Sequence, residues 1–147
     1  MACPYFHAVK ARSQTDHSRS AMLPLGDAWE GICRAIPEQP WEPGEATLLT
    51  CCNLGYARGC CARFPDDTGP DAVRFTITGD DDAGIHLYYV LERNHHPLAH
   101  GPLTFSAPGA IEGAPAADGA ALRLAVAYVA SYRRRKLEAC GHTRASR

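Results

Sequence analysis

Two stretches in the second half of the chain alternate apolar and polar residues, as strands with one buried face do. They cover Ala72–Thr78 and Ile85–Leu91, and the aspartate-rich segment Gly79–Gly84 between them has the composition of a turn. The pattern therefore predicts an antiparallel hairpin over residues 72–91. A third strand is expected at Leu103–Ser106, after a histidine- and proline-containing loop at Asn94–Pro102.

The last part of the chain changes to helical spacing. Residues 107–119 are rich in alanine, proline and glycine and are predicted to be a linker, with Asp118 as the helix cap. A long helix is expected over residues 119–139, with Gly141 as its end and a basic cluster, Arg133–Lys136, where the helix dipole favours positive charge. Its expected buried stripe consists of Leu122, Ala125, Val126, Val129 and Tyr132.

The first 65 residues show little periodicity. We expect irregular structure over residues 1–20, a short extended piece within residues 23–35, and a loop at residues 37–44. A short helix is predicted from Glu45 to Cys52, with Gly55 as the left-handed residue that ends it. Together these elements predict an α+β fold in a single domain, residues 1–147. A cysteine-organised, loop-rich half (1–65) is expected to pack on the small antiparallel sheet and long helix of residues 71–140.

Cysteine is the residue type that points to chemistry. The chain has seven cysteines, and four of them form two adjacent pairs, Cys51-Cys52 and Cys60-Cys61, on either side of a glycine-containing turn. The chain has no basic start followed by an apolar run, so we expect a cytoplasmic protein that is not inserted in a membrane. In the reducing cytoplasm cysteines are more often ligands or catalysts than disulfides.

Two short motifs resemble each other: Cys3-Pro4-Tyr5-Phe6 and Cys61-Ala62-Arg63-Phe64 each place an aromatic residue three positions after a thiol. Adjacent side chains diverge, so one thiol from each pair is expected to bind a metal. The predicted ligands are Cys3, Cys33, Cys52 and Cys61, with Cys51 and Cys60 as alternates. Cys140, near the end of the chain, is the weakest candidate.

Single thiols dispersed along the sequence favour a [4Fe–4S] cluster as the cofactor. Structural zinc sites usually contain C-x2-C or C-x4-C spacings, which these cysteines lack. The first hypothesis is therefore a small iron–sulfur protein that transfers electrons, or reports redox state, to a protein partner. The alternatives are a zinc-containing binding module for a protein or nucleic acid, and a thiol-dependent enzyme.

Charge narrows the range of partners. The formal net charge is −1 in 147 residues, so no overall field attracts nucleic acid or an anionic membrane. The cluster Arg133–Lys136 could bind an acidic partner, but its position at a helix end explains it equally well. With every iron ligated by cysteine, a redox carrier is favoured over an enzyme, although the sequence does not exclude an enzyme. The sequence gives no indication of the oligomeric state.

Overall fold

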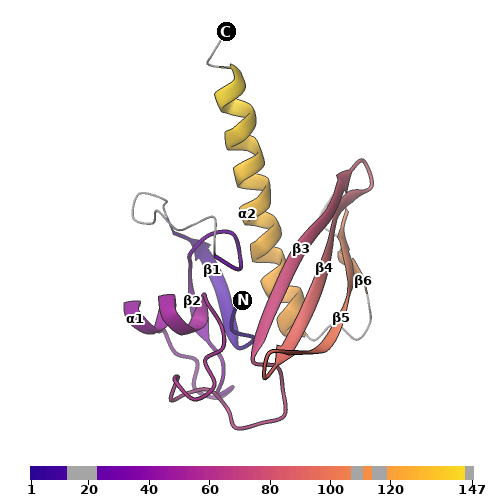
Figure 1. Ribbon diagram of the computed structural model, residues 1–147. Coiled ribbons are helices and arrows are strands. Elements are labelled where there is room, and N and C mark those ends of the chain that lie inside the picture. Colours follow the sequence, from indigo (N-terminus) through magenta and orange to yellow (C-terminus); the bar gives the residue numbers. More distant parts are fainter. Residues whose placement is uncertain (13–22, 107–110, 114–118, 145–147) are drawn as a thin grey trace.

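The computed structural model describes residues 1–12, 23–106, 111–113 and 119–144, with side chains described to residue 141 (Figure 1). It has an α+β architecture with two antiparallel sheets, a long C-terminal helix and a short helix. The elements are β1 (Phe6–Ala11), β2 (Trp29–Cys33), α1 (Glu45–Thr47), η3 (Leu48–Cys52), β3 (Ala72–Asp81), β4 (Gly84–Arg93), β5 (His96–Phe105), β6 (Ile111–Gly113) and α2 (Gly119–Arg144).

The larger sheet has the order β3-β4-β5-β6 and confirms the predicted hairpin. The strands are longer than expected, because pairing continues to Asp81 opposite Gly84 and leaves a two-residue turn. A bulge between Ile77 and Gly79 shifts the register in the aspartate-rich segment that sequence alone assigned to a turn. The alternation itself is as predicted: every apolar residue expected on the inner face of β4 is buried, namely Ile85, Leu87, Tyr89 and Leu91.

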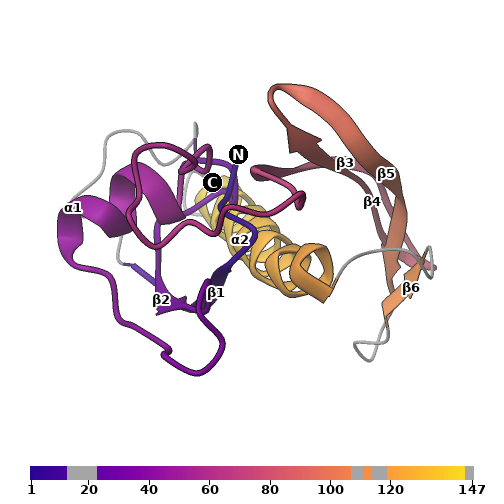
Figure 2. The same cartoon turned by 90° about the horizontal axis from the view of Figure 1, so that it is seen from below.

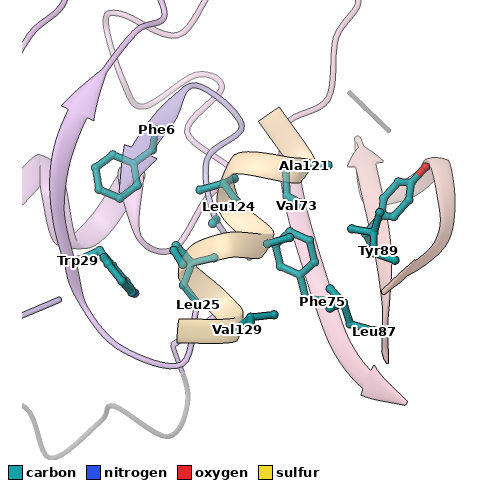
Figure 3. Close-up of a cluster of buried hydrophobic side chains, with 14 of the residues drawn as sticks. Phe6, Leu25, Trp29, Val73, Phe75, Leu87, Tyr89, Ala121, Leu124 and Val129 are labelled. Atoms are coloured by element: carbon teal, nitrogen blue, oxygen red, sulfur yellow. The ribbon is translucent and has the colours of Figure 1, made fainter. Parts of the chain in front are cut away.

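Helix α2 lies between the two sheets, with β1 and β2 on one side and the larger sheet on the other (Figure 2). In the core, Leu124 and Val129 of α2 lie between Phe6, Leu25 and Trp29 on one side and Val73, Phe75 and Leu87 on the other (Figure 3). The expected buried stripe was partly wrong, since Val126 is half exposed and Ala121 and Leu124 are buried instead. Contact with two layers shifts the buried arc away from Val126.

Two predicted irregular segments proved to be strands. Within residues 1–20, expected to be irregular, Phe6–Ala11 forms β1 and pairs with β2. Asn94–Pro102, expected to be a loop, contains only a two-residue turn before β5 begins at His96. Proline misled this prediction, because Pro97 and Pro102 lie where β5 is not paired with β6. A strand tolerates proline along such an unpaired edge.

Other expectations about the ends of elements had mixed outcomes. Helix α2 continues to Arg144 through Gly141, which does not end it. The segment assigned to a linker contains β6 at residues 111–113, whereas the predicted cap Asp118 lies outside the described residues. The extended piece before Cys33 is confirmed as β2. Within the described ranges, no helix combines the length and apolar character needed to cross a lipid bilayer.

The basic cluster on α2 is largely engaged within the chain. Arg134 pairs with the buried carboxylate of Asp27 and with Glu138, and the Lys136 ammonium lies 2.5 Å from a carboxylate oxygen of Asp80. Arg135 donates to the Ser131 carbonyl at 3.4 Å. These contacts hold the C-terminal half of α2 against the segment before β2 and the tip of β3.

A buried asparagine joins the cysteine-bearing turn to the smaller sheet. Asn53 accepts a hydrogen bond from the Trp29 backbone N–H at 2.9 Å. Its side-chain amide donates to the carbonyls of Trp29 and Leu48, at 3.0 and 2.9 Å. The Trp29 indole in turn donates to Ser131 of α2 at 3.2 Å. One side chain therefore links η3 to β2, which packs on α2.

We predict that Asn53→Ala lowers the free energy of unfolding by about 2–4 kcal/mol, because it leaves buried backbone groups of Trp29 without partners. Urea denaturation measures the loss. The matched control is Leu54→Ala at the next position, whose side chain is 44% exposed and whose removal should cost less than about 1 kcal/mol. Equal losses in the two variants would contradict the bridging role of Asn53.

Candidate metal centre

The first cysteine pair lies in a widened helical turn. Helix α1 begins after Gly44 and continues as the π-helical turn η3, in which the Asn53 N–H donates to the Leu48 carbonyl at 3.0 Å. This confirms the short helix predicted from residue 45, although sequence alone did not indicate its π character. Cys51 and Cys52 are both buried in this turn. π-Helical turns are frequent at functional sites.

Gly55 ends this turn in the left-handed conformation, as predicted, with φ of +70°. Space as well as backbone conformation requires glycine here. A Cβ atom at this position would lie 2.3 Å from the Met1 carbonyl oxygen, because the N-terminal segment passes directly over the turn. The N-terminal segment can therefore approach the first cysteine pair closely.

That close approach brings Cys3 to Cys52. The Cys3 backbone N–H donates to the Cys52 carbonyl at 3.0 Å, and Ala2 pairs with Val73 of the larger sheet. Both cysteines are buried. Two predicted ligands that are 49 positions apart in the chain are thus held together by a backbone hydrogen bond.

Cys33 joins them through the smaller sheet. It is the last residue of β2 and pairs with Phe6, three positions after Cys3. Its backbone also exchanges hydrogen bonds with Trp41, at 2.8 and 3.0 Å. The Cys33 side chain is buried. The extended piece predicted to deliver this thiol toward the core therefore does so.

The second cysteine pair follows a tight turn. The backbone N–H groups of Cys60 and Cys61 both donate to the Ala57 carbonyl, at 3.1 and 2.8 Å. The Phe64 N–H then donates to the Cys61 carbonyl at 3.0 Å, just as the Phe6 N–H donates to the Cys3 carbonyl at 3.1 Å. The two similar sequence motifs therefore form the same type of turn.

Aromatic contact ties these two motifs together. The rings of Tyr5 and Phe64, one from each motif, pack edge to face with their centroids 5.3 Å apart. The Tyr5 hydroxyl donates to Asp67 at 2.6 Å, and the Arg58 guanidinium lies over the Phe64 ring while pairing with Asp71. This aromatic and ionic layer fixes the second turn against the N-terminal segment.

The predicted ligands interact electrostatically. Burial raises the pKa of the Cys52 thiol, and repulsion from thiolates formed at the neighbouring cysteines, Cys3, Cys33, Cys61 and Cys51, would raise it further. Burial likewise raises the pKa of Cys3 to about 12, against the opposing effect of a hydrogen bond from the Tyr5 backbone N–H. Cys33 and Cys61 thus lie within electrostatic range of both Cys3 and Cys52, and the raised pKa values of Cys3 and Cys52 favour their neutral thiols.

The remaining cysteines occupy different surroundings. The two alternates, Cys51 and Cys60, face each other with their sulfur atoms 3.9 Å apart. Cys140 is exposed on α2 and takes no part in this neighbourhood. In the described part of the chain, no three or more His, Cys, Asp or Glu side chains form a group that could hold a metal ion.

Sequence reasoning missed several residues that shape the site. Tyr56, in the turn between the cysteine pairs, donates to the buried carboxylate of Glu92, and its ring stacks on His95 with centroids 4.4 Å apart. Asn94 and His95 make the β4–β5 turn with positive φ. The dipeptide Asn-His gives a weak turn signal, but nothing in the sequence associates Tyr56 with a carboxylate 36 residues away.

Comparison with models of protein families, with characterised proteins and with solved structures finds no match for this chain.

The Tyr56–Glu92 contact predicts a change in stability at alkaline pH. Burial and the hydrogen bond to Glu92 raise the pKa of Tyr56 from 10.0 to about 12. The raised pKa belongs to the folded state. The contribution of the Tyr56–Glu92 contact to the free energy of unfolding is therefore complete below pH 10 and is lost as the pH rises from 10 to 12. Urea midpoints of Tyr56→Phe should therefore fall less over this interval than those of the unsubstituted protein. Parallel pH profiles would refute this contribution.

Proposed function

We propose that this protein binds a [4Fe–4S] cluster through Cys3, Cys33, Cys52 and Cys61 and transfers electrons or reports redox state. The observation that carries the proposal is the backbone hydrogen bond from Cys3 to Cys52, with Cys33 and Cys61 close enough to influence the pKa values of both thiols. The four proposed ligands come from different segments of the chain. The N-terminal turn, β2, η3 and the second cysteine turn contribute one each.

The chemistry of the donor set fits this cofactor. Iron–sulfur clusters are held by cysteine thiolates, and iron supplies the positive charge that buried thiolates lack. The Tyr5 backbone lowers the pKa of Cys3 and so favours its thiolate, and backbone N–H groups placed in this way adjust the potential of a bound cluster. The packed rings of Tyr5 and Phe64, which follow Cys3 and Cys61 in the chain, would limit the access of water to a cluster.

The distribution of the thiols along the chain favours a cluster over a single zinc ion. In structural zinc sites two ligands usually come from one knuckle, so that four thiolates reach one ion at about 2.3 Å. Here each thiol comes from a separate segment, which suits a centre with several irons, each taking one cysteine. Zinc stays the second candidate, since it would use the same donors.

A cluster ligated by four cysteines supplies one-electron transfer and has no open position for a substrate. We therefore propose a redox carrier or sensor that acts on a protein partner in the cytoplasm, rather than an enzyme. Exposed apolar side chains near the cysteine segments, Ile36, Trp41 and Leu54, support such a contact. The internal pairing of Arg134 and Lys136 disfavours nucleic acid as the partner.

We predict that Cys52→Ser and Cys61→Ser each reduce bound iron from about four atoms per chain to less than one, because each removes the ligand of one iron. Iron and acid-labile sulfide are measured on protein purified without oxygen. Far-ultraviolet circular dichroism shows whether each variant keeps its secondary structure.

Three matched variants serve as controls. Cys51→Ser and Cys60→Ser change the neighbour of each proposed ligand, and Cys140→Ser changes an exposed cysteine on α2. All three should retain iron. If iron is lost from Cys51→Ser or Cys60→Ser and kept in Cys52→Ser or Cys61→Ser, the ligand assignment is wrong. Equal retention in all five variants would refute the site.

A further inference from the structure

Two of the three cysteines that are not proposed ligands, Cys51 and Cys60, lie against each other. The Sγ atoms of Cys51 and Cys60 are 3.9 Å apart. Cys60 is held in this position by its own thiol, which contacts the Ala57 and Tyr56 carbonyls at 3.4 and 3.7 Å. On the other side, the Thr50 hydroxyl lies 3.6 Å from the Cys51 sulfur. Each sulfur of the pair therefore has a fixed place opposite the other.

We propose that Cys51 and Cys60 form a reversible disulfide in response to small-molecule disulfides such as oxidised glutathione. The two sulfurs need to approach from 3.9 Å to a bond length of about 2 Å, a movement within reach of side-chain rotation and small loop shifts. Cys52 is the sequence neighbour of Cys51, and Cys61 is the sequence neighbour of Cys60. A bond within either adjacent pair would instead require a strained eight-membered ring.

Access and local freedom also favour this pair. Among the cysteines other than Cys140, only Cys60 is exposed to solvent, so an oxidant reaches Cys60 before its partner Cys51, which is buried. The preceding Gly59 has φ of +83° and nothing within 4 Å of the position a Cβ would take. Gly59 therefore has open space beside it and the conformational freedom of glycine, both of which favour a small shift of Cys60 toward Cys51.

The exchange proceeds in two displacements. Cys60 loses its proton and its sulfur attacks one sulfur of glutathione disulfide, and the other glutathione leaves and takes up a proton. Cys51 then loses its proton, and its sulfur attacks the Cys60 sulfur and forms the Cys51–Cys60 disulfide. The second glutathione leaves Cys60, takes up a proton and becomes a thiol. Two cysteine thiols are oxidised by two electrons, one glutathione disulfide is reduced to two thiols, and the protons balance.

The product would close a ten-residue loop, from Cys51 to Cys60, which contains the proposed ligand Cys52 and ends next to the proposed ligand Cys61. It would bind η3 covalently to the second cysteine turn. This restricts the separation of those two segments without using a thiol assigned to the cluster. The inference concerns a different pair of sulfurs from the proposed function and stands whether the centre holds iron, zinc or neither.

The sequence offers a direct assay. Trypsin cleaves after Arg34, Arg58 and Arg63, so Cys51 and Cys60 fall in separate peptides, residues 35–58 and 59–63. The protein as purified is treated with oxidised glutathione, its free thiols are alkylated, and the digest is analysed by mass spectrometry without reduction. We expect the two peptides to be joined with the loss of two hydrogens, and fragmentation to locate the bond at Cys51 and Cys60.

Cys60→Ser should abolish the linked peptide, and Cys140→Ser, which also removes an exposed cysteine, should retain it. The titre of free thiols should fall by two on oxidation and recover with dithiothreitol. No linked peptide, a bond through Cys52 or Cys61, or a link that persists in Cys60→Ser would overturn the proposal. Metal analysis of the same samples tests the proposed function separately, because protein without iron can still form the Cys51–Cys60 link.

Discussion

The hydrogen bonds of Ala2 and Cys3 are the constraint on which the rest of the structure depends. Ala2 exchanges two backbone hydrogen bonds with Val73 in the larger sheet, each 2.9 Å long, and Cys3 donates to the carbonyl of Cys52. Ala2 and Val73 are fully buried. Consecutive residues therefore attach the N-terminal segment to the sheet and to the first cysteine turn, and Cys3 is placed against Cys52 as a result.

Sequence periodicity correctly predicted the strands that bury one face and expose the other. Strands β3 and β4 bury one face, so Val73, Phe75 and Leu87 give a clear alternation. Strand β1 was missed because its residues after Phe6 are half-buried or exposed, and β5 because its prolines lie outside the part of the strand that pairs with β6. In both strands, tertiary pairing decides the structure where local pattern is weak.

The candidate site was predictable where residue type alone indicates its chemistry, as it does for cysteine. The two Cys-x-x-Phe motifs indicated Cys3 and Cys61, and they form matching turns whose rings meet. The polar framework was not predictable, because Asn53 bonds to Trp29 over 24 positions and Tyr56 to Glu92 over 36. Nothing local in the sequence distinguishes such an asparagine or tyrosine from a surface residue.

The central claim is that four thiols from four segments hold an iron–sulfur cluster. The most direct test is the absorption spectrum of protein purified without oxygen, with iron, sulfide and zinc measured on the same sample. The account predicts broad visible absorption from thiolate-to-iron charge transfer, with about four irons and four sulfides per chain. A colourless protein with about one zinc per chain, or with no metal, would contradict it.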